Sequence, residues 1–227
     1  MAQTWRELLF IHWPVPVEAL RAVVPPQLPL DTYEGQAWLA VVPFGMSIRA
    51  RATPPIPGLS NFLELNVRTY VTLEGKPGVF FFSLDAGNPA AVMGARTVHL
   101  PYYYAWMAMR RRGDEIGYAS QRVAPRPLGA NFRARYRPFG PAEAPLPGTL
   151  VHFLTERYCL YAVDRRGAVS RIQIHHPPWP LQQAECEIEL NTMTAAIPLA
   201  LPDTKPLLHY SERQDMVNWT AERVPIG

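Results

Sequence analysis

The chain has 227 residues, of which 48% are hydrophobic and 18% charged, and its formal net charge is +3. This is the composition of a globular protein that is long enough to bury one core. No run of about 18 apolar residues predicts a membrane span, and the first 20 residues lack the pattern of a secretory signal peptide. Cys159 and Cys186 have no CxxC spacing, so we expect no disulfide scaffold and a cytoplasmic location.

The first third of the chain predicts one helix and two strands. Residues 15–31, "VPVEALRAVVPPQLPLD", predict a short helix that Pro25 and Pro26 end. Residues 36–52 are rich in strand-forming side chains, and residues 53–60 predict a loop. In "NFLELNVRTYVTL", residues 61–73, apolar and polar side chains alternate. Glu64, Asn66, Arg68 and Tyr70 therefore share one face of a predicted strand.

The middle of the chain predicts a strand, a helix and a hairpin. "VFFFSLD", residues 79–85, predicts a buried strand, and residues 88–98 predict a helix with Asn88 as N-cap. The segments 99–110 and 115–123 predict two strands joined by a tight turn. Residues 131–139 predict a further strand.

The last third of the chain predicts a second hairpin, over residues 148–179, that turns at 164–167. For residues 180–191 both a helix and a strand fit, and we favour the start of a helix. Residues 206–219 predict an edge strand, which leaves self-association open. Together these elements predict an α+β fold that is mostly antiparallel β, with a few short helices, in one domain over residues 1–227.

Motifs for several kinds of chemistry are missing from the sequence. The histidines have no metal-ligand spacing, no GxSxG marks a serine nucleophile, and no glycine-rich loop predicts a phosphate site. We therefore expect no metal and no cofactor. Arginines at 110–112 and at Arg133, Arg135 and Arg137 allow a nucleic-acid surface, but a solvated hairpin tip explains the first run better, and we expect no nucleic-acid partner.

Charged residues inside predicted strands are the main candidates for a site. Glu64 and Arg68 share a strand face, and Glu156 and Arg157 interrupt "FLTERYCLY". Two interpretations are open. These charges lie on solvated faces or in ion pairs, or the sheet closes around a cavity whose wall includes Glu64, Arg68 and Tyr70. An arginine in such a cavity favours a carboxylate, because its planar fork matches two oxygens.

Five ordered motifs resemble a known family. They are "FLELNVRTYV", "GVFFFSLDA", "GARTVHLPYYYA", "LTERYCLY" and "HHPPWPLQ". Together they are similar to the YqjF-like family of uncharacterised bacterial proteins, and the similarity covers most of the chain. That resemblance implies no particular activity.

Roughly residues 60–107 also resemble acetoacetate decarboxylase. In that family a glutamate-bearing strand, a turn, an aromatic strand and a short helix ending in Gly-Arg-Glu precede Gly-Phe-Pro-Lys-Lys. Here the strand of Glu64, "EGKPG", "VFFFSLD", Gly94-Ala95-Arg96 and "HLPYY" follow in the same order. The resemblance implies a decarboxylase-like double sheet or barrel that encloses a central pocket.

The chain departs from the decarboxylase pattern at the reactive lysine. Tyr102 and Tyr103 stand where that family has two lysines, and a phenol cannot form an imine. The chain's two lysines, Lys76 and Lys205, lie in a predicted turn and between prolines, so we expect no Schiff-base chemistry. One tyrosine of the run would point into the pocket and donate a hydrogen bond; the alternative is that Tyr102 and Tyr104 are core and Tyr103 a structural donor.

The resemblance therefore implies a pocket for a small carboxylate or keto compound. The catalytic candidates are Glu64 as acid or base and Tyr103 as donor. The binding candidates are Arg68, Arg96, His99, Tyr102 and Tyr104, with Glu156, Arg157, His176 and Trp179 as secondary candidates beyond the decarboxylase-like segment. Binding without chemistry and catalysis by a lyase, isomerase or hydrolase both remain open.

Overall fold

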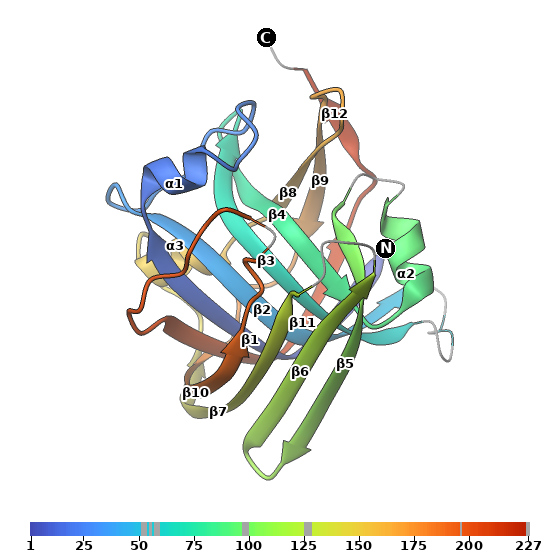
Figure 1. Cartoon of the computed structure of the whole chain (residues 1–227), viewed down its shortest axis with the longest axis vertical. Coiled ribbons are helices and arrows are strands. Elements are labelled where there is room, and N and C mark those ends of the chain that lie inside the picture. The colour runs from blue at the N-terminus through green and yellow to red at the C-terminus, as the bar shows by residue number, and fades with distance from the viewer. Residues whose placement is uncertain are drawn as a thin grey trace.

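The computed structural model describes residues 1–50, 54, 56, 60–96, 100–124, 129–195 and 197–225. Within these ranges, twelve strands form one sheet and three short helices lie at its margins (Figure 1). The strands are β1 (Ala2–Val15), β2 (Ala37–Arg49), β3 (Asn61–Leu73), β4 (Lys76–Ala86), β5 (Tyr102–Arg112), β6 (Glu115–Ala124), β7 (Asn131–Glu143), β8 (Cys159–Val163), β9 (Val169–His175), β10 (Leu181–Asn191), β11 (Leu207–Asn218) and β12 (Glu222–Val224). The helices are α1 (Val17–Arg21), α2 (Pro89–Arg96) and α3 (Leu150–Thr155).

The sheet closes on itself twice. Its strand order is β12-β9-β8-β4-β3-β2-β1-β11-β10-β7-β6-β5, and two further pairings join β4 to β5 and β9 to β11. Two rings of strands result, and they share β1, β2, β3, β4 and β11, which we call the shared wall. One ring is completed by β10, β7, β6 and β5, and the other by β8 and β9. Antiparallel pairing dominates, as the sequence predicts.

Two strand pairs, β4–β5 and β4–β8, are parallel, and the sequence analysis predicted neither of them. Strand β4 pairs in parallel with β5 through Asp85 and Tyr103 because α2 carries the chain back between them. Asn88 caps this helix as predicted, since its Oδ1 accepts hydrogen bonds from the backbone N–H of Ala90, at 2.9 Å, and of Ala91. The crossover places β5, which carries Tyr102, next to β4, and β4 pairs on its other side with β3, the strand of Glu64. This arrangement helps to bring Tyr102 close to Glu64.

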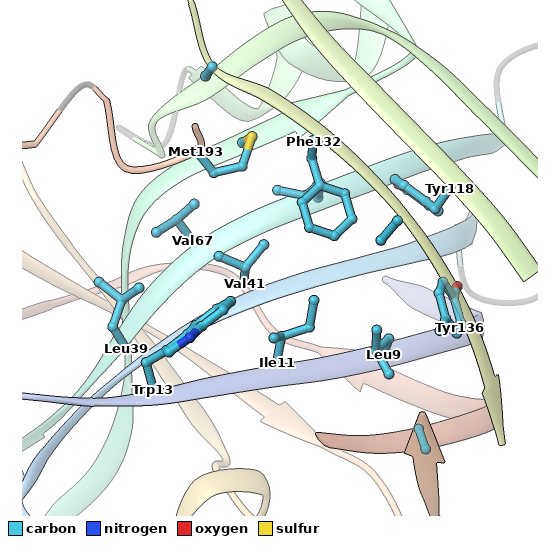
Figure 2. Close-up of a cluster of buried hydrophobic side chains, with 14 of the residues drawn as sticks. Leu9, Ile11, Trp13, Leu39, Val41, Val67, Tyr118, Phe132, Tyr136 and Met193 are labelled. Carbon is cyan, nitrogen blue, oxygen red and sulfur yellow. The ribbon is translucent and has the colours of Figure 1, made fainter. Parts of the chain in front are cut away.

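The hydrophobic core lies on one face of the shared wall. Strand alternation turns Leu9, Ile11 and Trp13 of β1 to this face, where they meet Val67 of β3 and Phe132 of β7. Figure 2 shows these side chains gathered between the shared wall and β6–β7. The opposite face of the same strands therefore has to be covered by the second ring, and that face carries the polar row of β3.

A glycine permits the second ring to close. An added Cβ at Gly78 of β4 would lie 2.6 Å from the carbonyl oxygen of Cys159 and 2.7 Å from the ring of Tyr161. Both neighbours belong to β8, which pairs in parallel with β4 at Val79 and Phe80. A side chain at position 78 would thus separate the two strands.

Two predicted segments have a different secondary structure. Residues 150–155 form α3 rather than the start of a hairpin, because Thr149 caps them and its Oγ1 accepts from the N–H of His152. Residues 181–191 form β10 rather than a helix. Their alternating Glu185 and Glu187 lie opposite Arg137 and Arg135 of β7, so cross-strand charge pairs favour the strand.

The predicted edge strand at the C-terminal end is an inner strand. Strand β11 pairs with β1 from Val217 opposite Ala2 to Leu207 opposite His12, and also with β10 and β9. The strand β1, which the sequence analysis did not predict, supplies the partner that makes β11 internal. The proposed basis for self-association through this edge is therefore wrong.

Candidate functional site

The polar face of β3 borders a large cavity inside the second ring. The cavity has a volume of about 910 Å³ and opens to solvent at one end. The expected alternation holds, since Leu65 and Val67 pack in the core while Glu64, Asn66 and Arg68 line the cavity. The rest of the described wall is mainly apolar and includes Trp5, Met46, Ile48, Phe62, Val79, Phe81, Leu84, Leu100, Leu160, Ile172, Ile174, Trp179 and Met216.

Strand register orders the lining residues by depth. The rim includes Met1, Ile56 and Trp219, which are 45%, 59% and 49% exposed. Phe62 lies next to this rim, Glu64 comes two residues further along β3, and Arg68 lies four residues beyond Glu64. At about 3.3 Å per residue, Arg68 lies roughly 13 Å deeper than Glu64. The charged groups of β3 are therefore arranged from the middle of the cavity to its floor.

Glu64 is a buried carboxyl group in contact with the tyrosine strand. Its side chain is 2% exposed, and the hydroxyl of Tyr102 donates to its Oε2 at 2.8 Å. Burial raises the pKa of Glu64 to about 8, and the nearby Asp85 adds to the rise while the Tyr102 hydrogen bond opposes it. At neutral pH Glu64 is therefore mostly protonated. It can donate a proton to a group in the cavity.

Arg68 is a buried cation at the floor of the cavity. It is 6% exposed, and its guanidinium carbon lies 5.2 Å from the ring centre of Phe10 and 5.9 Å from that of Tyr70. Its Nε has no hydrogen-bond partner, and no carboxylate of the described residues lies within ion-pair distance of it. A buried charge without a counter-charge is costly, so this arrangement favours an anion supplied from outside.

Arg157 differs from Arg68 because it has its own counter-ion. Its Nη1 lies 2.5 Å from Oδ2 of Asp31, and its Nε donates to the carbonyl of Phe153 at 2.6 Å. Arg157 lines the cavity together with His176 and Trp179. Burial lowers the pKa of His176, so this imidazole is neutral near pH 7.

Glu156 supports this corner and does not line the cavity. Its Oε1 accepts from the backbone N–H of Trp179 at 2.9 Å, and its Oε2 accepts from the hydroxyl of Tyr158. The ring of Tyr158 stacks on His176 with 4.6 Å between centroids. Glu156 thus ties the "TERY" and "HHPPW" segments together.

The structure separates Tyr103 and Arg96 from the cavity lining. Tyr103 packs beneath the guanidinium of Arg122, 3.9 Å from ring centre to carbon, and Arg122 forms a fully buried ion pair with Asp85 at 2.6 Å. Arg96 is exposed, and its Nε donates to the carbonyl of Tyr102 at 2.9 Å. Glu64, Arg96 and Tyr103 therefore do not meet in the cavity, and Tyr102 is the tyrosine that faces it.

Three more expected residues lie away from the described lining. Tyr104 is a half-buried residue of β5 that pairs with Ala86 of β4, and His99 lies outside the described residues. Sequence reasoning placed Asn66 on the face of β3 but did not select it for the site, although the alternation alone was enough to do so. Tyr70, which the sequence analysis expected in the cavity wall, is absent from the described lining; it is buried, and its hydroxyl lies 2.7 Å from Nε2 of the buried His12.

No lysine is present in the described cavity wall, so the residue that forms the Schiff base in the decarboxylase has no counterpart there. Lys76 and Lys205 are exposed and neither lines the cavity. Within the described ranges, no group of three or more His, Cys, Asp and Glu side chains lies close enough to hold a metal ion. No helix among the same residues is long and apolar enough to cross a membrane.

Three of the six arginines that suggested a nucleic-acid surface, Arg111, Arg135 and Arg137, are paired with acids. Arg137 contacts Glu185 at 2.7 Å, Arg135 contacts Glu187 at 3.4 Å, and the Arg111 guanidinium lies 2.8 Å from a carboxylate oxygen of Glu7. These acids offset the positive charge that a nucleic-acid surface would need.

Comparison with known proteins places the chain in a family. The family model DUF2071, described as an uncharacterized conserved protein, matches residues 2–215. The chain belongs to the DUF2071 family. It is also 51% identical over 221 residues to the uncharacterized protein YqjF of Bacillus subtilis (strain 168), across 96% of this chain and 90% of that protein. The YqjF-like resemblance in the sequence is thus confirmed.

Solved structures share the fold of this DUF2071 protein at low identity. The enduracididine biosynthesis enzyme MppR complexed with pyruvate is 12% identical with a TM-score of 0.70, over 99% of this chain and 90% of that chain. An acetoacetate decarboxylase-like enzyme from Sphingomonas wittichii RW1 is 13% identical with a TM-score of 0.64, over 99% and 92%. Acetoacetate decarboxylase from Legionella pneumophila has the same identity and TM-score, over 99% and 88%. The decarboxylase-like fold is confirmed.

Proposed function

We propose that the cavity binds a small molecule that carries a carboxylate or oxo group, without forming a Schiff base. The observation that carries this proposal is the state of Arg68, a cation 6% exposed with no carboxylate partner among the described residues. A bound carboxylate would supply the missing counter-charge. The bidentate geometry of a guanidinium would also orient it.

The groups around Arg68 suit the same ligand. Glu64 is uncharged below about pH 8, so it would not repel a bound anion. Arg157 is already neutralised by Asp31 and would add polar contacts rather than a second free charge. A relative with this fold is complexed with pyruvate, a small keto acid, which supports the chemical class of the ligand.

Thermal unfolding against a panel of small carboxylates and keto acids tests this proposal. A ligand that binds only the folded protein raises its stability by about 2.7 kcal/mol at a hundredfold excess over its Kd. We expect stabilisation by acids that is absent for the matched amides, and its loss in the Arg68→Met variant. The Arg135→Met variant, which removes an exposed arginine of β7, should respond like the parent protein. Equal stabilisation of the Arg68→Met variant would contradict the proposal.

A second candidate function is catalysis on such a ligand, with Glu64 as general acid or base. The observation in its favour is the pKa of Glu64, about 8 in the cavity, because proton transfer is most effective when the pKa lies near the working pH. If acids bind, product analysis with the Glu64→Gln variant separates the two functions. Catalysis requires turnover that this variant loses while its ligand binding persists, and binding alone requires no turnover in either protein.

A further inference from the structure

The cavity is larger and longer than a small keto acid requires. Its volume of about 910 Å³ would hold roughly 15 to 30 heavy atoms, if each takes up to twice the 30 Å³ that a water molecule occupies in the liquid. A keto acid with about seven heavy atoms would fill a fraction of this space. Along β3, the path from Arg68 at the floor to Phe62 beside the rim spans six residues, or roughly 20 Å.

The chemistry of the wall changes along this path. Buried charged and polar side chains, among them Arg68, Arg157 and Asn66, occupy the deep part of the cavity. Apolar side chains surround the way out, from Leu84 of β4, which pairs with Asn66, to Met46 and Ile48 of β2. Phe81 and Val79 of β4 lie at the level of Arg68 and below it, because they pair with Arg68 and Tyr70. An exposed arginine, Arg49, also stands at the rim. The described wall thus offers a buried charged floor at Arg68 and a mainly apolar passage, which Glu64 interrupts, to a rim that includes the solvent-exposed Arg49.

The rim adds an independent observation. Met1, Ile56 and Trp219 are large apolar side chains that line the mouth and are about half exposed. Clustered exposed apolar surface of this kind marks a binding site when it is continuous with an apolar cavity. A small acid bound at Arg68 would leave this surface bare.

From these observations we propose that the ligand is an elongated amphipathic carboxylate, with its acid group at Arg68 and an apolar chain that runs to Met1, Ile56 and Trp219 at the rim. This ligand class rests on the proposed function, because it uses the same cavity and the same arginine. One occupant then satisfies both the buried cation and the exposed apolar rim. The reverse orientation would place a hydrocarbon end against an uncompensated charge.

Calorimetric titration with straight-chain carboxylates of increasing length tests the ligand class. All ligands are used below their micelle-forming concentrations, with the primary alcohols of equal length as controls. Burial of each added methylene should tighten binding roughly fourfold until the chain reaches the rim. Carboxylates should bind more tightly than the alcohols at every length, and the Arg68→Met variant should abolish this difference.

A rim substitution locates the far end of the chain. The Trp219→Ser variant should weaken the binding of the longest carboxylates by about tenfold and leave short ones unchanged. The control is Trp106→Ser, which removes a tryptophan 63% exposed on β5, outside the described lining, and should change neither. Tight binding of short acids with no gain from length would overturn the elongated ligand and keep the proposed function. Length-dependent binding that is equal for acids and alcohols would overturn both.

Discussion

The buried carboxyl of Glu64 gives the folded protein a titration that can be measured. Its pKa is about 8 in the folded state against 4.5 for an exposed glutamate, so the folded protein retains a proton that the unfolded chain loses. Stability from this group is complete below pH 4.5 and declines as the pH rises to 8. At 1.36 kcal/mol per pKa unit, the loss amounts to at most about 5 kcal/mol.

The Glu64→Gln variant isolates this effect, because glutamine keeps an acceptor for Tyr102 and does not titrate. Denaturant unfolding from pH 5 to pH 9 should show the parent protein losing stability relative to the variant across this range. A difference between the two proteins that is constant with pH would contradict the raised pKa of Glu64.

Two buried arginines should respond in opposite ways to removal of their charge. Arg122 neutralises the buried Asp85, so Arg122→Met leaves an unpaired carboxylate and should cost about 3–5 kcal/mol. Arg68 has no such partner, and Arg68→Met should leave the ligand-free protein as stable or more stable than the parent. Thermal unfolding of both variants without ligand checks this contrast. Similar destabilisation would show that Arg68 has a structural role.

At the scale of elements, the closure of the second ring depends on Gly78. The Gly78→Ala variant places a methyl group against the backbone carbonyl of Cys159 and should cost about 1–3 kcal/mol. Gly117 of β6 offers a matched control, since a Cβ there meets the carbonyl oxygen of Arg110 at an ordinary 3.8 Å. Denaturant unfolding should show little change for Gly117→Ala. Equal losses of stability in the two variants would show that the close approach of β4 and β8 does not require glycine at position 78.

The elements that could be predicted are those with a local cause. Glu64, Leu65, Asn66 and Val67 alternate because one face of the strand meets the cavity and the other meets the core, and this alternation could be predicted from the sequence. The N-cap at Asn88 could also be predicted, because Asn followed by Pro at the start of a helix is a local sequence pattern. Strand β10 could not be predicted, because its stability comes from pairing with β7, some fifty residues earlier in the chain.

The residues of the candidate site show the same contrast between local and long-range causes. The position of Glu64 and Arg68 on one face followed from spacing alone. The exclusion of Tyr103 did not, because it depends on the buried pair of Arg122 and Asp85, which lie on β6 and β4 and have no shared local pattern. The local sequence of either strand does not predict an ion pair between residues this far apart in the chain.

At the scale of the whole molecule, one part of the cavity wall, the β8–β9 hairpin, forms few strand pairings with the rest of the sheet. Among the described residues, the β8–β9 hairpin is joined to β4 by two residue pairs and to β11 by two, whereas β1 and β11 share ten. We expect backbone amides of β8 and β9 to exchange hydrogen faster than those of β1 and β2. A ligand that spans the cavity should slow exchange in the hairpin most. Uniform protection around both rings would show that the hairpin does not open on its own.

The two faces of β3 serve different purposes, and this should be visible in the history of the family. Leu65 and Val67 are held by the packing of a core that any relative with this fold has to fill. The side chains of Asn66 and Arg68 lie on the opposite face of the same strand and line the cavity. The ligand in the cavity therefore constrains which residues can occupy these two positions. Among related chains, positions 63, 65 and 67 of β3 should vary only between aliphatic residues of similar volume. Positions 64, 66 and 68, which line the cavity, should change together in those relatives that bind a different ligand.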